Sequence, residues 1–361
     1  MRFVPPTLAL FGLLAGCSSP APDAPADAGA LVDAADAAAP VGADVTVETF
    51  ANTNLYFTGA DNKRTVDAAG SFPSVGTYER ITLHLALSCP SNKCDPWDRF
   101  GTLGVVTAKG DKPENDTVIE LARFITPYGV GASWDYDLTD LRPLLTGDVT
   151  LRAFIDTWVG PGSAYGNGWS LSASFEMTGG VPDREVVGVL PVWTMHSGVY
   201  GDPAKPLSGS FAPQTLPLPK AASSFALRSL VTGHGQGNAG NCAEFCARDH
   251  TLSVAGHAHT QKIWRTDCAK TAAPGQQGTY TLSRAGWCPG ADVKAWSVDV
   301  TDDLAGAAAA TVGYDVQSYD NTCRPDASMC AACSLGTGCA YDGGNHTEPS
   351  YFLSTLLIAY R

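Results

Sequence analysis

Several common signatures are missing from this 361-residue sequence. Charged residues make up only 16% of the chain, and 23 Lys and Arg stand against 36 Asp and Glu, a net charge of −13. An acidic chain without basic runs lacks the charge that binds a phosphate backbone, which argues against nucleic-acid binding. After the N-terminus there is no apolar run of about 18 residues, the length that a membrane-spanning helix needs. Gly-x-Ser-x-Gly, Walker, His-Glu-x-x-His and dinucleotide-binding motifs are also absent.

Cysteine, glycine and proline are plentiful instead, with 11 Cys, 38 Gly and 24 Pro. In an exported protein this composition indicates a loop-rich fold held by disulfides. Cys89 and Cys94 close one short loop, Cys242 and Cys246 close another, and Cys268 has Cys288 as a candidate partner.

Four cysteines late in the chain could form two more bonds: Cys323, Cys330, Cys333 and Cys339. Their spacing does not fix the pairing. The Cys330-x-x-Cys333 spacing also suits zinc, but an oxidising compartment favours disulfides over a metal site.

The N-terminus predicts export. Met1-Arg2-Phe3 is a basic start, residues 4–14 are mostly apolar, and Leu14-Ala15-Gly16-Cys17 follows. Residues 1–16 are therefore interpreted as a signal peptide. The last four residues resemble the bacterial lipobox, in which the Cys becomes the lipidated first residue. We expect a lipoprotein anchored at Cys17, sorted to the outer membrane or cell surface because Ser18 is not acidic; the alternative is an ordinary export signal.

The segment after Cys17 cannot build a core. Residues 18–44 contain 11 Ala, 4 Pro and 5 Asp, and no Lys, Arg or aromatic residue. We interpret residues 17–44 as a disordered tether.

Alternation of apolar and polar residues dominates from Val45 onward, and helical periodicity is nearly absent. A period of two is typical of strands with one buried face. The clearest cases are residues 81–87, 149–155, 169–177 and 296–300. Short strands separated by Gly, Pro and Asn turns predict an all-β fold of sandwich type.

A weak internal repeat predicts two similar domains. Asp137-Leu-Thr-Asp140-Leu141 and Asp299-Val-Thr-Asp302-Asp-Leu304 each follow a strand pattern and are interpreted as short capped turns. The clearest candidate for the boundary between them is the turn-forming stretch Gly179-Gly180-Val-Pro182-Asp183. We expect an N-terminal domain over residues 45–182 and a C-terminal domain over residues 183–361.

Two acidic residues stand beside the small disulfide loops. Asp98 lies in Cys94-Asp-Pro-Trp-Asp98-Arg99, directly after the strand at 81–87, and Glu244 lies inside Cys242-Ala-Glu244-Phe-Cys246. Short disulfides fix the backbone, as pre-organisation of a catalytic carboxylate requires. The alternative for Asp98 is an ion pair with Arg99 on a solvated rim.

Together with two further segments, these motifs resemble the peptide:N-glycosidase F family, amidases that release N-linked glycans from glycoproteins. The family has Cys-Asp-Glu-Trp-Asp-Arg at the first motif and Cys-Ala-Glu-Trp-Cys at the second. Arg123-Phe-Ile-Thr-Pro-Tyr128 and Arg284-Ala-Gly-Trp-Cys-Pro-Gly290 are identical to family stretches. The resemblance covers residues 45–361.

The resemblance implies two side-by-side, eight-stranded antiparallel jelly-roll domains with the active site in the cleft between them. It implies that Asp98 is the main catalytic acid, that Glu244 is a second acid from the other domain, and that Arg284 contacts the substrate. Trp97 and Arg99 share the motif of Asp98 and are expected to bind substrate. The family's three disulfides match Cys89–Cys94, Cys242–Cys246 and Cys268–Cys288, and no metal or cofactor is required.

The implied reaction cleaves the amide between Asn and N-acetylglucosamine, giving Asp and a glycosylamine. It needs an activated water and a proton for the departing nitrogen, and two carboxylates with separated pKa values can divide this work. Tryptophans beside the carboxylates suit the apolar face of a sugar. We expect a monomer that acts on N-glycosylated proteins or glycopeptides and meets a membrane only through Cys17.

The sequence departs from the family at three places. The third acid of the family is a Glu in Thr-Glu-Thr-Trp, whereas this chain has Ile155-Asp156-Thr157-Trp158. Asp156 is retained as a catalytic candidate and Trp158 as a substrate-binding one, with a plain surface acid as the alternative for Asp156. His234 stands where the family member compared has Trp, and is also assigned to substrate binding. Residues 323–339 have no counterpart in that family member and are interpreted as a surface insertion.

Two rival functions have some support in the sequence. His257-Ala-His259 on a strand would direct both imidazoles to one face, as in a copper monooxygenase with the same paired architecture, but the remaining ligands are scattered. A glycan-binding lipoprotein without catalysis is the second rival, and the changes at Asp156 and His234 motivate it.

Overall fold

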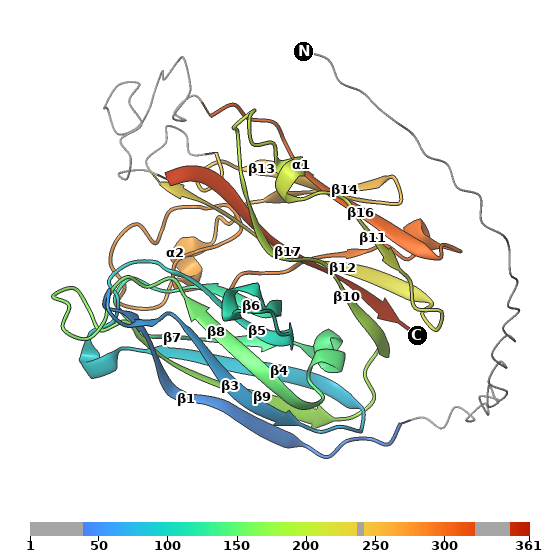
Figure 1. The fold of residues 1–361 in the computed structure, drawn as a ribbon, viewed down its shortest axis with the longest axis horizontal. Coiled ribbons are helices and arrows are strands. Elements are labelled where there is room, and N and C mark those ends of the chain that lie inside the picture. The colour runs from blue at the N-terminus through green and yellow to red at the C-terminus, as the bar shows by residue number, and fades with distance from the viewer. Residues whose placement is uncertain (1–38, 237–241, 322–346) are drawn as a thin grey trace, which may run out of the picture. The chain divides into compact units, whose positions relative to one another are not determined.

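The computed structural model describes residues 39–236, 242–321 and 347–361 (Figure 1). The predicted signal peptide, Cys17, most of the predicted tether and the four late cysteines (Cys323, Cys330, Cys333 and Cys339) lie outside the described residues. Among the described residues, no helix combines the length and the apolar character needed to cross a membrane.

The N-terminal part is an antiparallel sandwich of two sheets, with strand orders β2-β1-β9-β4-β7 and β3-β8-β5-β6. The strands are β1 (Val45–Phe57), β2 (Asn62–Lys63), β3 (Thr65–Phe72), β4 (Tyr78–Ser88), β5 (Phe100–Ala108), β6 (Thr117–Ile125), β7 (Ala132–Asp137), β8 (Gly147–Ile155) and β9 (Trp169–Gly179).

The C-terminal part repeats this plan in two four-stranded sheets, ordered β10-β17-β12-β15 and β11-β16-β13-β14. The strands are β10 (Val186–Val199), β11 (Gln214–Pro217), β12 (Ser224–Gln236), β13 (Arg248–Val254), β14 (His257–Ile263), β15 (Trp296–Asp299), β16 (Ala309–Val316) and β17 (Thr347–Tyr360). Helical segments are short: α1 (Leu207–Ser210), α2 (Cys268–Thr271), η1 (Pro90–Asn92), η2 (Pro113–Asn115), η3 (Thr139–Leu144) and η4 (Asp302–Leu304).

Both parts have jelly-roll connectivity. With the two-residue β2 left aside and eight strands numbered along each domain, one sheet has the order first-eighth-third-sixth and the other second-seventh-fourth-fifth. This arrangement of two Greek keys in two sheets is a jelly roll. The predicted all-β class with two eight-stranded jelly rolls is confirmed, and the proposed boundary near residue 182 falls in the connection between β9 and β10.

The alternating segments became strands because their apolar residues fill the two cores. Ile81, Leu83, Leu85 and Leu87 of β4 are all buried. On β9 the buried apolar set is Trp169, Leu171, Ala173, Phe175 and Met177. Burial of one such side chain contributes about 1.5–3 kcal/mol, so the alternation fixes which face of each strand points inward.

The internal repeat marks equivalent corners of the two domains. Asp137 ends β7 and Asp299 ends β15, which are the sixth strands of their jelly rolls. Each carboxylate accepts a hydrogen bond of 2.9 Å from the backbone N–H two residues on, that of Thr139 or Thr301. The sequence repeat therefore reflects a carboxylate-capped turn leading into a 3-10 helix.

The last residues of the predicted tether are attached to the N-terminal domain. Gly42 donates its N–H to the carbonyl of Thr77 (3.0 Å), and Thr77 donates to that of Pro40 (2.9 Å). The contacts with the N-terminal domain thus include residues before Val45.

Arg123 of β6 is fully buried and joins the two domains. Its guanidinium donates to both carboxylate oxygens of Glu120 (2.8 and 2.7 Å), to the hydroxyl of Thr232 on β12 (3.0 Å) and to the carbonyl of Phe352 on β17 (2.8 Å). Ser354 of β17 donates a further hydrogen bond to Glu120. A buried ion pair is stable only when such added bonds satisfy both partners, and here those bonds come from the other domain.

The chain beyond Arg123 continues this contact. Segment 123–128 lies antiparallel to segment 288–293, which begins within the second identical motif and continues beyond it. Three backbone hydrogen bonds join them: Val293 N–H to Arg123 O (2.9 Å), Gly290 N–H to Ile125 O (2.9 Å) and Ile125 N–H to Ala291 O (3.3 Å). The first identical motif is therefore paired across the domain boundary with the end of the second motif and the residues that follow it.

Replacing Arg123 by Met should destabilise the protein by about 3–5 kcal/mol, because Glu120 would stay buried without its cation. Urea unfolding monitored by tryptophan fluorescence measures the change. Adding Glu120→Gln should recover part of the loss. Arg184→Met, which breaks an exposed 3.9 Å pair with Asp140, is the control and should cost about 1 kcal/mol or less. Equal midpoints for Arg123→Met and Arg184→Met would contradict this account.

Candidate active site

The loop that carries Asp98 is held by a buried carboxylate. The Cys89–Cys94 disulfide closes the chain after β4, and Asp95 follows with no exposed surface. Its carboxylate accepts hydrogen bonds from the backbone N–H of Trp97 (3.0 Å), the Nε of Arg99 (2.8 Å) and the hydroxyl of Thr157 (2.7 Å). These three bonds fix the backbone on both sides of Asp98 and tie it to the chain beyond β8.

Asp98 lies in a partly buried position, with 21% of its side chain exposed. Its Oδ2 accepts a hydrogen bond of 2.7 Å from the phenol of Tyr128 and lies 3.8 Å from Nη2 of Arg284. Burial raises the pKa of the Asp98 carboxyl above its ordinary value, while the hydrogen bond from Tyr128 and the charge of Arg284 act in the opposite direction.

Glu244 approaches from the C-terminal domain, inside the loop closed by the Cys242–Cys246 disulfide. Its Oε1 lies 3.2 Å from Nε of Arg284, and 14% of its side chain is exposed. Burial raises the pKa of Glu244 to about 8, opposed by Arg284 and reinforced by the negative charge of Asp98. At neutral pH this carboxyl is therefore largely protonated.

Arg284 connects the two acids. Its side chain is 1% exposed, and its guanidinium also donates to the carbonyls of Thr279 and Leu282 (3.0 Å each) and to the hydroxyl of Thr279 (2.9 Å). The rings of Phe245 and Trp287 lie 5.2 and 4.8 Å from its central carbon. The cation is thus locked in place, and one charge faces a carboxyl group from each domain.

Tyr128 and Thr279 belong to this cluster, and the sequence reasoning did not single them out. The Tyr128 hydroxyl lies 3.2 Å from that of Thr279, and its backbone N–H donates to Gln276 (3.2 Å). Burial raises the pKa of the Tyr128 phenol above its ordinary value, so it remains a proton donor to Asp98. The sequence did contain a pointer to Tyr128, because this residue ends motif 123–128, which is identical to a family stretch. Thr279 lies in none of the family motifs.

Asp156 has a different set of partners. It lies just beyond β8, and its carboxylate is 3.0 Å from Nη1 of Arg64. Trp158, two residues later, is 53% exposed, and its ring lies 4.3 Å from the Arg64 guanidinium carbon and 5.2 Å from the Phe57 ring. Arg64 therefore contacts both Asp156 and Trp158.

Trp97 and Arg99 flank Asp98. The exposed Trp97 ring lies 5.5 Å from the Tyr165 ring and 5.2 Å from the Arg99 guanidinium carbon. Arg99 forms its ion pair with Asp95 instead (Nε–Oδ2, 2.8 Å). The alternative of an Asp98–Arg99 ion pair therefore does not explain the position of Asp98.

His234 is packed among aromatic rings. Its imidazole stacks on Trp287 (5.3 Å) and meets Phe100 and Phe352 edge-on, and it shares a 2.8 Å hydrogen bond with Thr232. Burial, with a smaller contribution from the charge of Arg123, lowers its pKa to about 3, so the ring is neutral at physiological pH.

The third predicted disulfide, Cys268–Cys288, is present as well, so all three pairs implied by the family resemblance form. It links the start of α2 to the segment that contacts residues 123–128.

The two histidines of the copper alternative face an aspartate. His259 Nε2 lies 2.6 Å from Asp303, and His257 Nδ1 lies 3.8 Å from it. Within residues 39–236, 242–321 and 347–361, no three His, Cys, Asp or Glu side chains are arranged to hold a metal ion.

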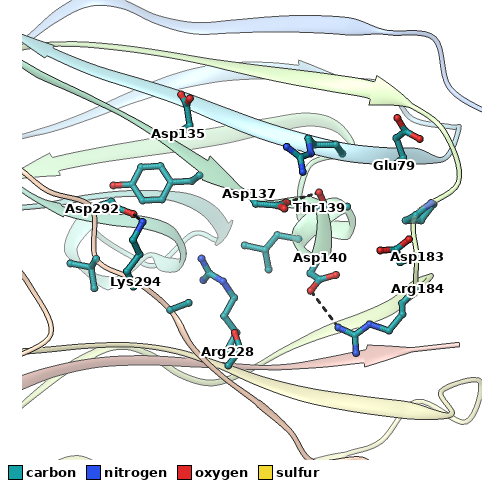
Figure 2. A pocket seen from close by; sticks show the side chains of 17 residues that line it. Glu79, Asp135, Asp137, Thr139, Asp140, Asp183, Arg184, Arg228, Asp292 and Lys294 are labelled. Atoms are coloured by element: carbon teal, nitrogen blue, oxygen red, sulfur yellow. Dashed lines mark hydrogen bonds and ion pairs between the residues drawn. The ribbon is translucent and has the colours of Figure 1, made fainter. Parts of the chain in front are cut away.

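A polar pocket of about 530 Å³ lies elsewhere in the molecule. Figure 2 shows its walls, with Asp135, Asp137 and Asp140 on one side and Arg228 and Lys294 on the other. Asp98, Glu244 and Arg284 are not among its lining residues. We place the candidate active site at Arg284 because two partly buried carboxyl groups with raised pKa values meet there, as acid–base chemistry requires.

Comparisons with known proteins match this chain to one family. A family model described as "Peptide-N-glycosidase F, N terminal" matches residues 110–166, and one described as "Peptide-N-glycosidase F, C terminal" matches residues 206–334. The peptide-N(4)-(N-acetyl-β-D-glucosaminyl)asparagine amidase F of Elizabethkingia miricola is 29% identical over 301 residues, which cover 78% of this chain and 80% of that protein.

Solved structures show the same architecture. The three-dimensional structure of PNGase F from Flavobacterium meningosepticum, described as a glycosylasparaginase, matches with a TM-score of 0.70 and 25% identity over 88% of this chain and 96% of its own. PNGF-II matches with a TM-score of 0.62 and 17% identity over 88% of this chain and 65% of its own, which shows the fold alone. The family models, the sequence relative and the shared pair of jelly rolls show that this chain belongs to the peptide-N-glycosidase F family.

Proposed function

We propose that the protein hydrolyses the amide bond between N-acetylglucosamine and Asn, releasing N-linked glycans and converting the Asn to Asp. The observation that carries the proposal is the convergence of Asp98 and Glu244, one from each domain, on the single buried cation of Arg284. The amidase named among the relatives supports the same reaction. The substrates would be N-glycosylated proteins or glycopeptides, and the protein would act as a monomer.

Asp98 is proposed to be the base. With Glu244 protonated at neutral pH, the charge of Arg284 and the Tyr128 hydrogen bond are both available to an ionised Asp98. Asp98 would take a proton from a water molecule as the water oxygen bonds to the side-chain carbonyl carbon of Asn. The negative charge that develops on the carbonyl oxygen would be stabilised by a fixed donor such as Arg284.

Glu244 is proposed to be the acid. Collapse of the tetrahedral intermediate breaks the C–N bond, and the nitrogen leaves as a glycosylamine once it has gained a proton. A carboxyl whose pKa is about 8 holds that proton at neutral pH and can donate it directly or through one water. The two acids thus divide the work because burial separates their environments.

Asp98→Asn should lower the rate by at least about 10²–10⁴-fold, the range that a positioned acid or base contributes. The assay incubates the full chain with a denatured N-glycoprotein and with a short glycopeptide, and mass spectrometry follows the glycan and the gain of about one dalton at the sequon Asn. Asp183→Asn, an exposed aspartate in the domain connection, is the matched control and should keep full activity.

If the glycan stays attached to both substrates with the unmodified chain, hydrolysis is excluded. Glycopeptide binding by that inactive chain would then favour the glycan-binding alternative. Full activity of Asp98→Asn would show that Asp98 is not the base.

The proposed division of roles predicts a bell-shaped pH profile. Activity should rise as pH passes through the raised pKa of Asp98, because the base must be ionised. It should fall as pH passes about 8, because Glu244 must keep its proton. Glu244→Gln should lower kcat and remove the alkaline limb, whereas exposed Glu114→Gln should leave the profile unchanged. An alkaline limb that persists in Glu244→Gln would assign the acid to another group.

We also propose that the chain is exported and anchored to the outer membrane or cell surface by lipid on Cys17. The lipobox-like Leu14-Ala15-Gly16-Cys17 supports this proposal. Cys17→Ser should abolish incorporation of labelled palmitate in a bacterial host and move the protein from the membrane fraction to the soluble one, because two or more acyl chains are needed for stable anchoring. Ser19→Ala should change neither result. Unchanged labelling of Cys17→Ser would contradict the anchor.

A further inference from the structure

A loop of the C-terminal domain lies around Tyr128 of the N-terminal domain. It consists of Gln276-Gln277-Gly278-Thr279, a few residues after α2, and is called the 276–279 loop below. It contacts Tyr128 at three places: the backbone, the face of the ring and the hydroxyl group. Because Tyr128 donates the 2.7 Å hydrogen bond to Asp98, the position of this loop bears on the proposed base.

Gln276 holds the backbone of Tyr128. Its side chain is buried, with 4% of the residue exposed. Its Oε1 accepts a hydrogen bond from the Tyr128 N–H (3.2 Å), and its Nε2 donates one to the carbonyl of Pro289 (3.1 Å). One buried amide therefore joins the end of motif 123–128 to segment 288–293, and both of its polar ends have a partner, as burial requires.

Gly278 lies against the face of the Tyr128 ring. Its φ of +84° belongs to the left-handed region, which glycine adopts without strain. A Cβ atom at this position would be 3.2 Å from Cδ1, Cδ2 and Cε1 of the ring, closer than ordinary van der Waals contact. Glycine thus lets the loop pass close over the ring, and a larger residue would have to displace the ring or the loop.

Thr279 contacts the hydroxyl group of Tyr128, with 3.2 Å between the two oxygens. The Thr279 hydroxyl also accepts a hydrogen bond from Nη2 of Arg284 (2.9 Å). A phenol has one proton, and that of Tyr128 is donated to Asp98, so the proton between the two hydroxyls belongs to Thr279. A chain of hydrogen bonds therefore runs from Arg284 through Thr279 and Tyr128 to Asp98.

The ionisation of Asp98 responds to this chain. Four charged or titratable groups act on Asp98 or are acted on by it: Tyr128, Arg284, Arg99 and Glu244. Burial raises the pKa of Asp98, and the hydrogen bond from Tyr128 is the largest of the effects that lower it. If Tyr128 lost its position, the pKa of Asp98 would therefore rise.

We propose that the 276–279 loop keeps the phenol of Tyr128 on the Asp98 carboxylate, with Gln276 and Gly278 as positioning residues. Through this loop the C-terminal domain controls the charge of an acid that the N-terminal domain carries. The inference rests on the proposed function for the role of Asp98 as the base. The contact of the loop with Tyr128 does not depend on turnover, so it can be tested without it.

The test follows the titration of Asp98 in the full chain by carbon NMR of the side-chain carboxyl groups, and Asp98→Asn identifies the signal. Gly278→Ala and Gln276→Met should each move the midpoint to higher pH by about 0.5–1 pH unit, because the hydrogen bond from Tyr128 is weakened. Tyr128→Phe should move it at least as far. Adding Gly278→Ala to Tyr128→Phe should cause no further change, since the loop acts through the phenol.

Gly275→Ala is the matched control for Gly278→Ala. Gly275 has a φ of +82°, so alanine is strained there to the same degree. Beyond the chain neighbours, however, no atom would come nearer than 4.0 Å to its Cβ. Gly275→Ala should therefore leave the Asp98 midpoint unchanged. Equal midpoints in Gly278→Ala and Gly275→Ala would overturn the proposal.

Trp134→Phe is the control for Gln276→Met. Trp134 donates a 3.1 Å hydrogen bond to the carbonyl of Gly290, the neighbour of the residue that Gln276 binds, but the indole has no hydrogen bond to Tyr128. Its loss should loosen the same segment and leave the Asp98 midpoint in place. Thermal unfolding identifies any variant that does not fold, and Gln276→Met decides if Gly278→Ala is one of them. Equal midpoints in Gln276→Met and Trp134→Phe would contradict the role of Gln276.

Kinetics separate this proposal from the proposed function. In the pH profile of kcat/KM, Gly278→Ala should move the acid limb to higher pH and leave the alkaline limb in place, because Glu244 keeps its contact with Arg284. If the unmodified chain releases no glycan, hydrolysis is refuted, and the NMR titration still decides the role of the loop. If glycan is released but Gly278→Ala and Gly275→Ala have the same acid limb, hydrolysis stands and the proposed role of the loop is wrong.

Discussion

The buried contact made by Arg123 is the constraint on which the rest of the structure depends. Its guanidinium satisfies Glu120 within the N-terminal domain and Thr232 and Phe352 in the C-terminal domain, so neither domain can move away without exposing an unpaired buried charge. The next residues run along segment 288–293 and end at Tyr128, which reaches Asp98. The same few residues therefore fix the domains to each other and place one wall of the candidate site.

The pKa values around Arg284 depend on the fact that two carboxyl groups share one positive charge. Two carboxyl groups, Asp98 and Glu244, meet one cation in a partly buried site. Full ionisation of both acids would leave net negative charge with little water to screen it, and burial raises the pKa of both carboxyl groups. Asp98 has the added phenol of Tyr128, and the pKa of Glu244 rises to about 8. Burial raises both pKa values, and the hydrogen bond from Tyr128 opposes that rise at Asp98, so the two similar side chains differ chemically.

Rigid supports lie behind the residues of the site. Asp95 holds the loop of Asp98, disulfides close the loops before Asp98 and around Glu244, and the carbonyls near Thr279 hold Arg284. Arg64 contacts both Asp156 and Trp158 beyond β8. Such positioning lowers the entropy that a substrate must lose to reach a reactive geometry, which is how a site without a reactive nucleophile gains rate.

The sequence by itself determined the all-β class, the inward faces of the strands at 81–87 and 169–177, the carboxylate-capped turns after Asp137 and Asp299, and, through the family motifs, three disulfides and the identities of Asp98, Glu244 and Arg284. These follow from local periodicity, spacing and motif residues, which need no knowledge of distant contacts. Only the tertiary structure decided that Tyr128 and Thr279 join the cluster, that Arg64 holds Asp156, that His234 is stacked and neutral, and that motif 123–128 pairs with segment 288–293. Those contacts join residues far apart in the chain, and burial and pKa depend on what packs around a side chain, which no short stretch of sequence contains.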